Sequence, residues 1–484
     1  MAKTAVFDPS KDATILRVGT ISQSSAKQRA GRAGRTAPGV CHRLYSEADF
    51  DEMASDQPAE LLRVDATAAL LTIMRQIARH SEWIGTIRDF PFVEHPGVER
   101  LERSLEMLWH LGAIDSLENL TLTPHGMAMA RMKASAREAA IMFRAQQLGV
   151  ANLTAVALGM LGSYGTLFRR GRADEEVAAA QGKRRAFAGM FPTLGDLGTA
   201  VAVWLGARHL KGAELAQWCR EHSVSVRTLK GSMGTVRSLL FELSTTEAAM
   251  RTAKKETAKA SNADDAEEGA AVGDVDDRAL DTDDTTRGLE AVTEATLRDP
   301  DQILGLQQSL VAGYFGNFAY HLPRRDGAAG DSPPSYYLPR SNQVGVVGSR
   351  SVLRLAANGA DTDPAAQLPE MCLFLEIVDS HCVYISTLLG IDDATFQACV
   401  PSSFRDSAAY SGYLAANTRR QMLARPSVAA TNCGLALARL LQDRGGSAEA
   451  LVALYTRQKG LAEGADLIVE VDRRQQQVGW YSWG

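Results

Sequence analysis

Apolar residues recur every three or four positions between residues 58 and 244, a spacing that predicts amphipathic helices. In the clearest stripe, Leu101, Leu105 and Leu108 share one face, and Gly112 follows as a helix-ending glycine. Two short apolar runs after Gly112 predict a small strand pair. Two helices followed by a small β wing indicate a winged helix over residues 51–133.

The pattern changes to strand character over residues 303–405, where short runs are rich in β-branched and aromatic residues. These runs predict a small β-barrel. A hairpin is also expected within residues 4–20, around the turn-forming segment 8–12. The strand candidates of the barrel are 336–338, 343–347, 351–355, 371–378 and 382–386.

Two segments do not fit this scheme. Residues 261–286 hold ten Asp or Glu against the single base Arg278 and no aromatic residue, so we predict an acidic disordered insert over 245–302. Residues 406–484 are predicted to form a separate extension, with two or three helices within 407–460 followed by a strand and a tail. The pattern assigns no role to this extension.

Candidate chemistry is concentrated in the octamer Gln28-Arg29-Ala30-Gly31-Arg32-Ala33-Gly34-Arg35. Residues three apart share a helix face, so a helix here would project Arg29, Arg32 and Arg35 to one side. Guanidinium groups presented together can hold phosphate oxygens bidentately. A solvated basic helix face is the alternative interpretation.

The octamer, with Ile21–Ala26 before it and Pro38–Tyr45 after it, resembles motif VI of superfamily 2 helicases in the form used by DEAH-box/RHA RNA helicases. This resemblance implies that Gln28 orders the attacking water and that Arg32 and Arg35 act as arginine fingers toward ATP. Arg29 is implied as a further nucleotide-binding residue.

No Gly-x-x-x-x-Gly-Lys-[Ser/Thr] loop and no Asp-Glu-Ala-His box occurs in the 484 residues. The resemblance therefore implies the C-terminal part of a helicase, in which ATP and Mg²⁺ are held by a first lobe that is missing here. The enzyme would be an ATP-dependent RNA helicase, whereas this chain alone is predicted to be inactive.

The same resemblance names the parts of a multidomain, mostly helical α+β chain and supplies the strand expected at Arg43–Tyr45. The expected parts are a partial RecA-like α/β remnant over 1–50, the winged helix over 51–133, a helical ratchet of HA2 type over 134–244 and an OB-fold over 303–405.

Contact with single-stranded RNA is expected at cations of the ratchet and at one loop of the barrel. The candidates are Arg227, Lys230, Arg237, Ser349 and Arg350, each of which is alternatively an ordinary surface residue. Tyr336, Tyr337 and Tyr384 are candidate stacking rings or core rings. Many relatives use a G-patch partner, so an activator of that type is expected too.

The composition restricts the binding sites and the cellular compartment that we expect for this chain. The net charge of -5 gives no global nucleic-acid signal, so an RNA site must be a local basic surface. The six cysteines are far apart and form no metal-ligand spacing, which favours an intracellular, reducing compartment and no metal site. No apolar run is long enough to span a bilayer. A non-catalytic RNA-binding or scaffold protein descended from such a helicase is the alternative function.

Overall fold

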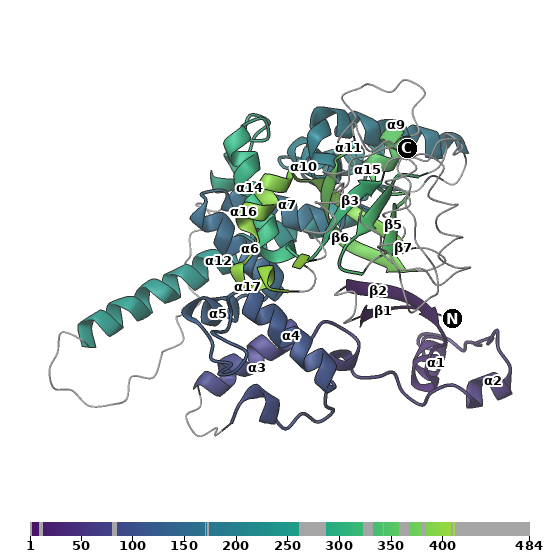
Figure 1. Ribbon diagram of the computed structural model, residues 1–484. Coiled ribbons are helices and arrows are strands. Elements are labelled where there is room, and N and C mark those ends of the chain that lie inside the picture. Colours follow the sequence, from purple (N-terminus) through teal and green to yellow (C-terminus); the bar gives the residue numbers. More distant parts are fainter. Residues whose placement is uncertain are drawn as a thin grey trace, which may run out of the picture. The chain divides into compact units, whose positions relative to one another are not determined.

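The computed structural model describes residues 2–8, 13–79, 85–169, 171, 174–260, 287–322, 333–341, 343–357, 368–379, 383–407 and 410–411 (Figure 1). The chain divides into two compact units, Met1–His321 with Pro333–Ser407, and Leu322–Ser332 with Ala408–Gly484. Only Leu322, Tyr410 and Ser411 of the second unit are described. The acidic stretch 261–286 and the elements expected after residue 411 therefore lie outside the described residues.

The first unit begins with the predicted hairpin. Strand β1 (Ala2–Asp8) pairs antiparallel with β2 (Ala13–Gly19) over the full length of both. The strand predicted at Arg43–Tyr45 is wrong. Among the described residues the β1–β2 sheet has two strands and does not reach residue 43, and the Leu44 side chain is 98% exposed.

Two buried leucine stripes build the next part, as the periodicity predicted. Leu70 and Leu71 face the core from one helix, Leu105 and Leu108 from the other. The predicted strand pair is confirmed in part, as a single antiparallel bridge between Ile114 and Leu122 with the Asp115 amide donating to Thr121 O and the Thr123 amide to Ala113 O. The Asp115 carboxylate accepts the Ser116 and Thr121 amides and closes a tight turn between the two segments. The elements are η1 (Glu60–Leu62), α3 (Thr67–Arg79), η2 (Ile87–Asp89), α4 (Val98–His110) and α5 (Pro124–Met129).

Helices dominate the described residues between 136 and 314, and α7 and α10 are almost entirely buried. Helix α7 packs against α6, α10 and α12. The disorder predicted over 245–302 is wrong at both ends of that range, because α12 continues to Ala260 and residues 287–302 are ordered around the buried Val292 and Leu297. The elements are α6 (Ala136–Gln147), α7 (Ala151–Leu161), α8 (Tyr164–Leu167), α9 (Asp174–Met190), η3 (Pro192–Leu194), α10 (Gly195–Ala207), α11 (Gly212–Glu221), α12 (Val226–Ala260) and α14 (Pro300–Tyr314).

The remaining strands close a barrel in the order β3-β4-β5-β7-β6, with β5 and β7 parallel (Figure 1). Its core includes Tyr336, Phe374 and Ile385. Four of the five predicted strands are confirmed, and the pattern had not indicated β3. The strands are β3 (Phe318–Leu322), β4 (Ser335–Leu338), β5 (Gln343–Val347), β6 (Met371–Asp379) and β7 (Val383–Gly390).

The strand predicted at residues 351–355 is wrong. Val352–Ala357 form helix α15, whose first amides are capped: Ser351 Oγ accepts Leu353 N–H and the Asp196 carboxylate accepts Val352 N–H. Two capped amides favour a helix start over strand pairing. Helices α16 (Asp393–Cys399) and α17 (Ser402–Arg405) follow the barrel.

The close approach of α7 to α12 gives a test of the packing. A Cβ at Gly159 would lie 2.6 Å from Val236 Cγ2 and 3.0 Å from the Val236 amide nitrogen. Gly159→Ala should therefore lower the free energy of unfolding by about 1–3 kcal/mol, measured by urea denaturation of the full chain. The control Gly231→Ala, in open space on α12, should raise it by about 0.5–1 kcal/mol. Equal effects would contradict the close contact.

Candidate functional site

The arginine-rich octamer begins on α1 (Gln23–Ala30), which is fixed at its N-terminal end. Ser22 Oγ accepts Ser25 N–H at 3.2 Å. The amide of Gln23 donates to Ala54 O and that of Ser24 to Ser55 O, both at 2.9 Å. These bonds dock α1 on the segment that follows α2 (Glu47–Asp51).

The helix ends at Ala30, inside the octamer. Gly31 N–H closes the last turn on Lys27 O, and Gly34 has a φ of +76° that an L side chain rarely adopts. Arg29 thus belongs to the helix, whereas Arg32 lies in a turn and Arg35 follows the left-handed glycine. The prediction that one helix face carries all three arginines is wrong, because the two glycines end the helix.

The four candidate nucleotide-binding side chains are exposed. Within the described residues, Gln28, Arg29, Arg32 and Arg35 make no side-chain hydrogen bond or ion pair. A neighbouring cation behaves differently, since Arg43 Cζ lies 4.7 Å from the Phe50 ring centroid. The octamer therefore offers guanidinium and amide donors that are not used internally.

Those donors suit the oxygens of a triphosphate. They include no carboxylate, the ligand that Mg²⁺ prefers in phosphoryl-transfer sites. In the part of the chain that the structure describes, no group of three or more His, Cys, Asp or Glu side chains is placed to hold a metal ion. The site thus fits a phosphate group and does not fit Mg²⁺.

The predicted RNA contacts lie on two other elements. Arg227, Lys230 and Arg237 are exposed on one side of α12, while Leu229 and Val236 on its other side are buried. Lys230 also acts electrostatically on Cys219 of α11, where burial raises the pKa of the thiol and the lysine charge lowers it.

Ser349 and Arg350 are exposed at the turn between β5 and α15. The Gly348 amide donates to Ile385 O at 2.9 Å and the Ser351 amide to Gly348 O at 3.0 Å, which defines the turn. Tyr336, a stacking candidate, is a fully buried core residue whose hydroxyl donates to Pro369 O. The structure thus groups the predicted residues on three elements: the octamer, α12 and this turn.

Pattern reasoning missed Asp196 at the start of α10. Its carboxylate is 0% exposed and accepts two amides of the barrel region, Val352 N–H at 2.7 Å and Leu388 N–H at 2.9 Å. Burial raises the pKa of Asp196, while those hydrogen bonds and the Arg184 charge lower it. The available signal was one acidic residue at the head of an otherwise apolar helix, 195–207.

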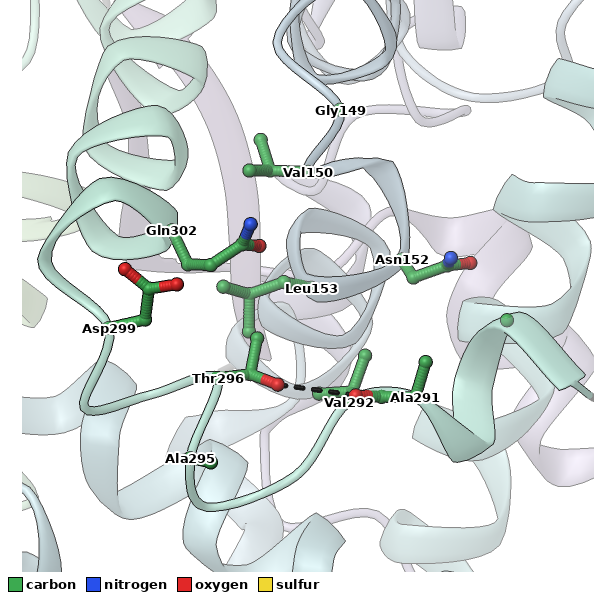
Figure 2. A pocket seen from close by; sticks show the side chains of 11 residues that line it. Gly149, Val150, Asn152, Leu153, Ala291, Val292, Ala295, Thr296, Asp299 and Gln302 are labelled. Atoms are coloured by element: carbon green, nitrogen blue, oxygen red, sulfur yellow. Dashed lines mark hydrogen bonds between the residues drawn. The ribbon is translucent and has the colours of Figure 1, made fainter.

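One pocket of about 410 Å³ lies between the start of α7 and the segment that leads into α14, and it holds none of the predicted residues (Figure 2). Asp299 and Gln302 lie on one side and Asn152 on the other. The Asp299 carboxylate accepts the Asp301 amide at 3.0 Å, and Thr296 Oγ1 donates to Ala291 O at 3.2 Å. Some of its polar groups are thus used to build the loop.

No single helix among the described residues is long and apolar enough to cross a membrane. Glu175–Met190 and Pro192–Ala207, bent by 103°, meet that test only as a pair and only by length and composition.

The Asp196 bonds yield a stability prediction. Asp196→Asn replaces one acceptor oxygen by an NH₂ donor and leaves a buried N–H unpaired, so the free energy of unfolding at pH 7 should fall by about 1–3 kcal/mol in urea denaturation. An unchanged value would contradict the role of the two bonds. In the wild-type protein, burial raises the pKa of Asp196 above its value in the unfolded chain, so the free energy of unfolding falls as the pH rises from the unfolded pKa to the folded pKa. The Asn variant, which has no carboxyl group at this position, should lose this dependence.

Comparison with known proteins gives relatives for about half of the chain, and no protein-family model matches. ATP-dependent RNA helicase DEAH11, chloroplastic, of Arabidopsis thaliana is 30% identical over 241 residues, 49% of this chain and 13% of that protein. Probable ATP-dependent RNA helicase DHX34 of Homo sapiens is 31% identical over 241 residues, 50% of this chain and 20% of that protein. The chain thus spans only 13% to 20% of the length of these relatives. Over about half of its own length, it is homologous to DEAH-box ATP-dependent RNA helicases, the family that its arginine-rich octamer resembles.

Proposed function

We propose that this chain is the C-terminal part of an ATP-dependent RNA helicase, which binds single-stranded RNA and supplies arginine fingers to ATP. The observation that carries the proposal is the exposed octamer. It matches motif VI in sequence, and its donors have no partner among the described residues of a chain homologous to DEAH-box helicases.

In this proposal Gln28 orders the attacking water, and Arg32 and Arg35 place positive charge on the oxygens where charge develops. Arg29, on the last turn of α1, binds the nucleotide beside them. The exposure of these side chains on a docked helix suits contact with a phosphate group brought by another lobe. Mg²⁺, for which the octamer has no ligand, would be held with ATP by that lobe.

The proposed parts follow the resemblance. Residues 1–50 would be the end of a RecA-like lobe, 51–133 a winged helix, 134–244 the ratchet and 303–405 an OB-fold. The helix pair α3–α4 and the closed five-stranded barrel support the second and fourth assignments. We also propose a G-patch-type activator and an intracellular, reducing compartment.

RNA would be held by phosphate contacts from α12 and from the turn at Ser349 and Arg350. These are surface cations and a hydroxyl on rigid elements, which is the usual supply of sequence-independent contacts. The barrel surface would add further contacts, because OB-type barrels bind single strands.

The first test measures RNA affinity by fluorescence anisotropy, with the full chain and a labelled oligouridylate. We expect binding that weakens with salt, and a further loss of about tenfold or more for the triple variant Arg227→Ala, Lys230→Ala, Arg237→Ala. The control is Arg251→Ala on the same helix, whose guanidinium pairs with Glu247 at 3.6 Å, and it should change little. No binding, or binding insensitive to salt, would overturn the RNA-binding proposal.

A second test measures ATP hydrolysis by the 484-residue chain with RNA present. No turnover above background is expected, because the sequence holds neither a Walker A loop nor an acidic box for Mg²⁺. Turnover that Arg32→Ala abolishes and Arg43→Ala preserves would contradict the assignment of the nucleotide pocket to another lobe.

A further inference from the structure

We propose that Asp196 is a positioning residue for RNA binding, because its carboxylate holds the turn that presents Ser349 and Arg350 to the phosphodiester backbone. The inference rests on the proposed RNA-binding function and adds a residue that the resemblance did not single out.

The position of the turn at Ser349 and Arg350 is restricted by the residues on either side of it. Its flanks, Gly348 and Ser351, are buried, whereas Ser349 and Arg350 between them are exposed. A Cβ on Gly348 would lie 2.8 Å from Ser386 Oγ, so the backbone runs directly against β7. The Gly348 amide donates to Ile385 O of that strand. The position of the turn therefore depends on the position of β7.

The Asp196 carboxylate accepts hydrogen bonds both from the end of the turn and from β7. One carboxylate oxygen accepts the amide of Val352, the residue that follows the turn, at 2.7 Å. The other accepts the amide of Leu388 in β7 at 2.9 Å. The Asp196 carboxylate thus fixes the end of the turn, at Val352, relative to β7. The start of the turn, at Gly348, is held against the same strand.

The carboxylate also connects this turn to the other proposed phosphate contacts. Asp196 belongs to α10, which packs against α7, and α7 packs against α12 with its exposed cations. A chain of packed helices therefore leads from Arg227, Lys230 and Arg237 to the turn. Both groups of side chains can contact one RNA strand only when the distance between them is fixed, because a shift of either group would break its phosphate contacts.

Stability alone gives a weak reason to bury this charge. A desolvated carboxylate is costly even with good partners, and apolar groups often replace buried ionic ones at no loss. Arg184, itself buried at 8% exposure, offsets part of the charge, and its Cζ lies 5.3 Å from the Tyr164 ring centroid. A geometric role in holding the turn is one that an apolar side chain cannot fill.

The ligand chemistry follows from the two exposed side chains. A guanidinium can hold two oxygens of one phosphate, and a hydroxyl donates one further hydrogen bond. Neither group reads a base edge when it contacts the backbone, so the turn suits sequence-independent binding of a single strand.

A double-mutant cycle tests the proposal with the full chain and the same labelled oligouridylate. Val352→Pro removes the N–H that donates to Asp196 and also replaces a buried valine side chain, at the first position of α15, where proline is tolerated. Val352→Pro and Asp196→Asn should each weaken RNA binding about fivefold, and each loss should be smaller when Arg350→Ala is present, because only the Ser349 contact then remains to be misplaced. The stability control is Asp392→Ala, which removes the side chain that caps α16 and should leave RNA affinity unchanged.

The outcomes separate the two levels of the proposal. Coupled losses with an unchanged Asp392→Ala variant support the positioning role. The positioning role is overturned by losses that add fully to that of Arg350→Ala, or by an unchanged affinity in Val352→Pro. RNA binding by the wild-type chain would still support the proposed function in either case. A wild-type chain that binds no RNA overturns both.

Discussion

The constraint on which the first unit depends most is the burial of the Asp196 carboxylate between α10 and the barrel. A charge without solvent access must be matched by donors, and here the donors are backbone amides of two different elements. The bonds therefore specify where the elements meet as well as how strongly. An apolar contact of similar area would permit sliding, because hydrophobic burial has no direction.

The arginine octamer differs from Asp196 in that its charged groups are exposed rather than buried. Its backbone is tied down through Ser22, Gln23 and Ser24, while its charged side chains are exposed. Gly31 and Gly34 end the helix and turn the chain, so Arg32 and Arg35 lie outside the helix that carries Arg29. A fixed backbone with free guanidinium groups loses little further backbone entropy when it meets an anion, which favours binding.

The sequence was informative where one face of an element is buried and the other is wet. The leucine stripe of α4 and the strands β4 and β5 were predicted for that reason. Strands β6 and β7, which are buried on both faces over 371–374 and 387–390, were predicted from short apolar runs rich in β-branched and aromatic residues. It failed at Val352–Leu355, an apolar run that suits a strand, because a carboxylate 156 positions earlier in the chain caps a helix start there. It failed at Arg32 and Arg35 because Gly31 and Gly34, which interrupt the regular arginine spacing, end the helix. Long-range capping leaves no periodic signal, so Asp196 could not be assigned a partner from the pattern.

The site was predictable to a similar degree. A contiguous motif pointed to the octamer as a candidate, because its candidate residues are neighbours in sequence. The contacts on α12 and at the turn of Ser349 and Arg350 come from elements over a hundred residues apart, and only packing relates them. If RNA occupies both, a movement of α10 would shift the turn directly, because the carboxylate and not a flexible side-chain layer carries the connection. The helical part and the barrel would then respond to RNA as one body.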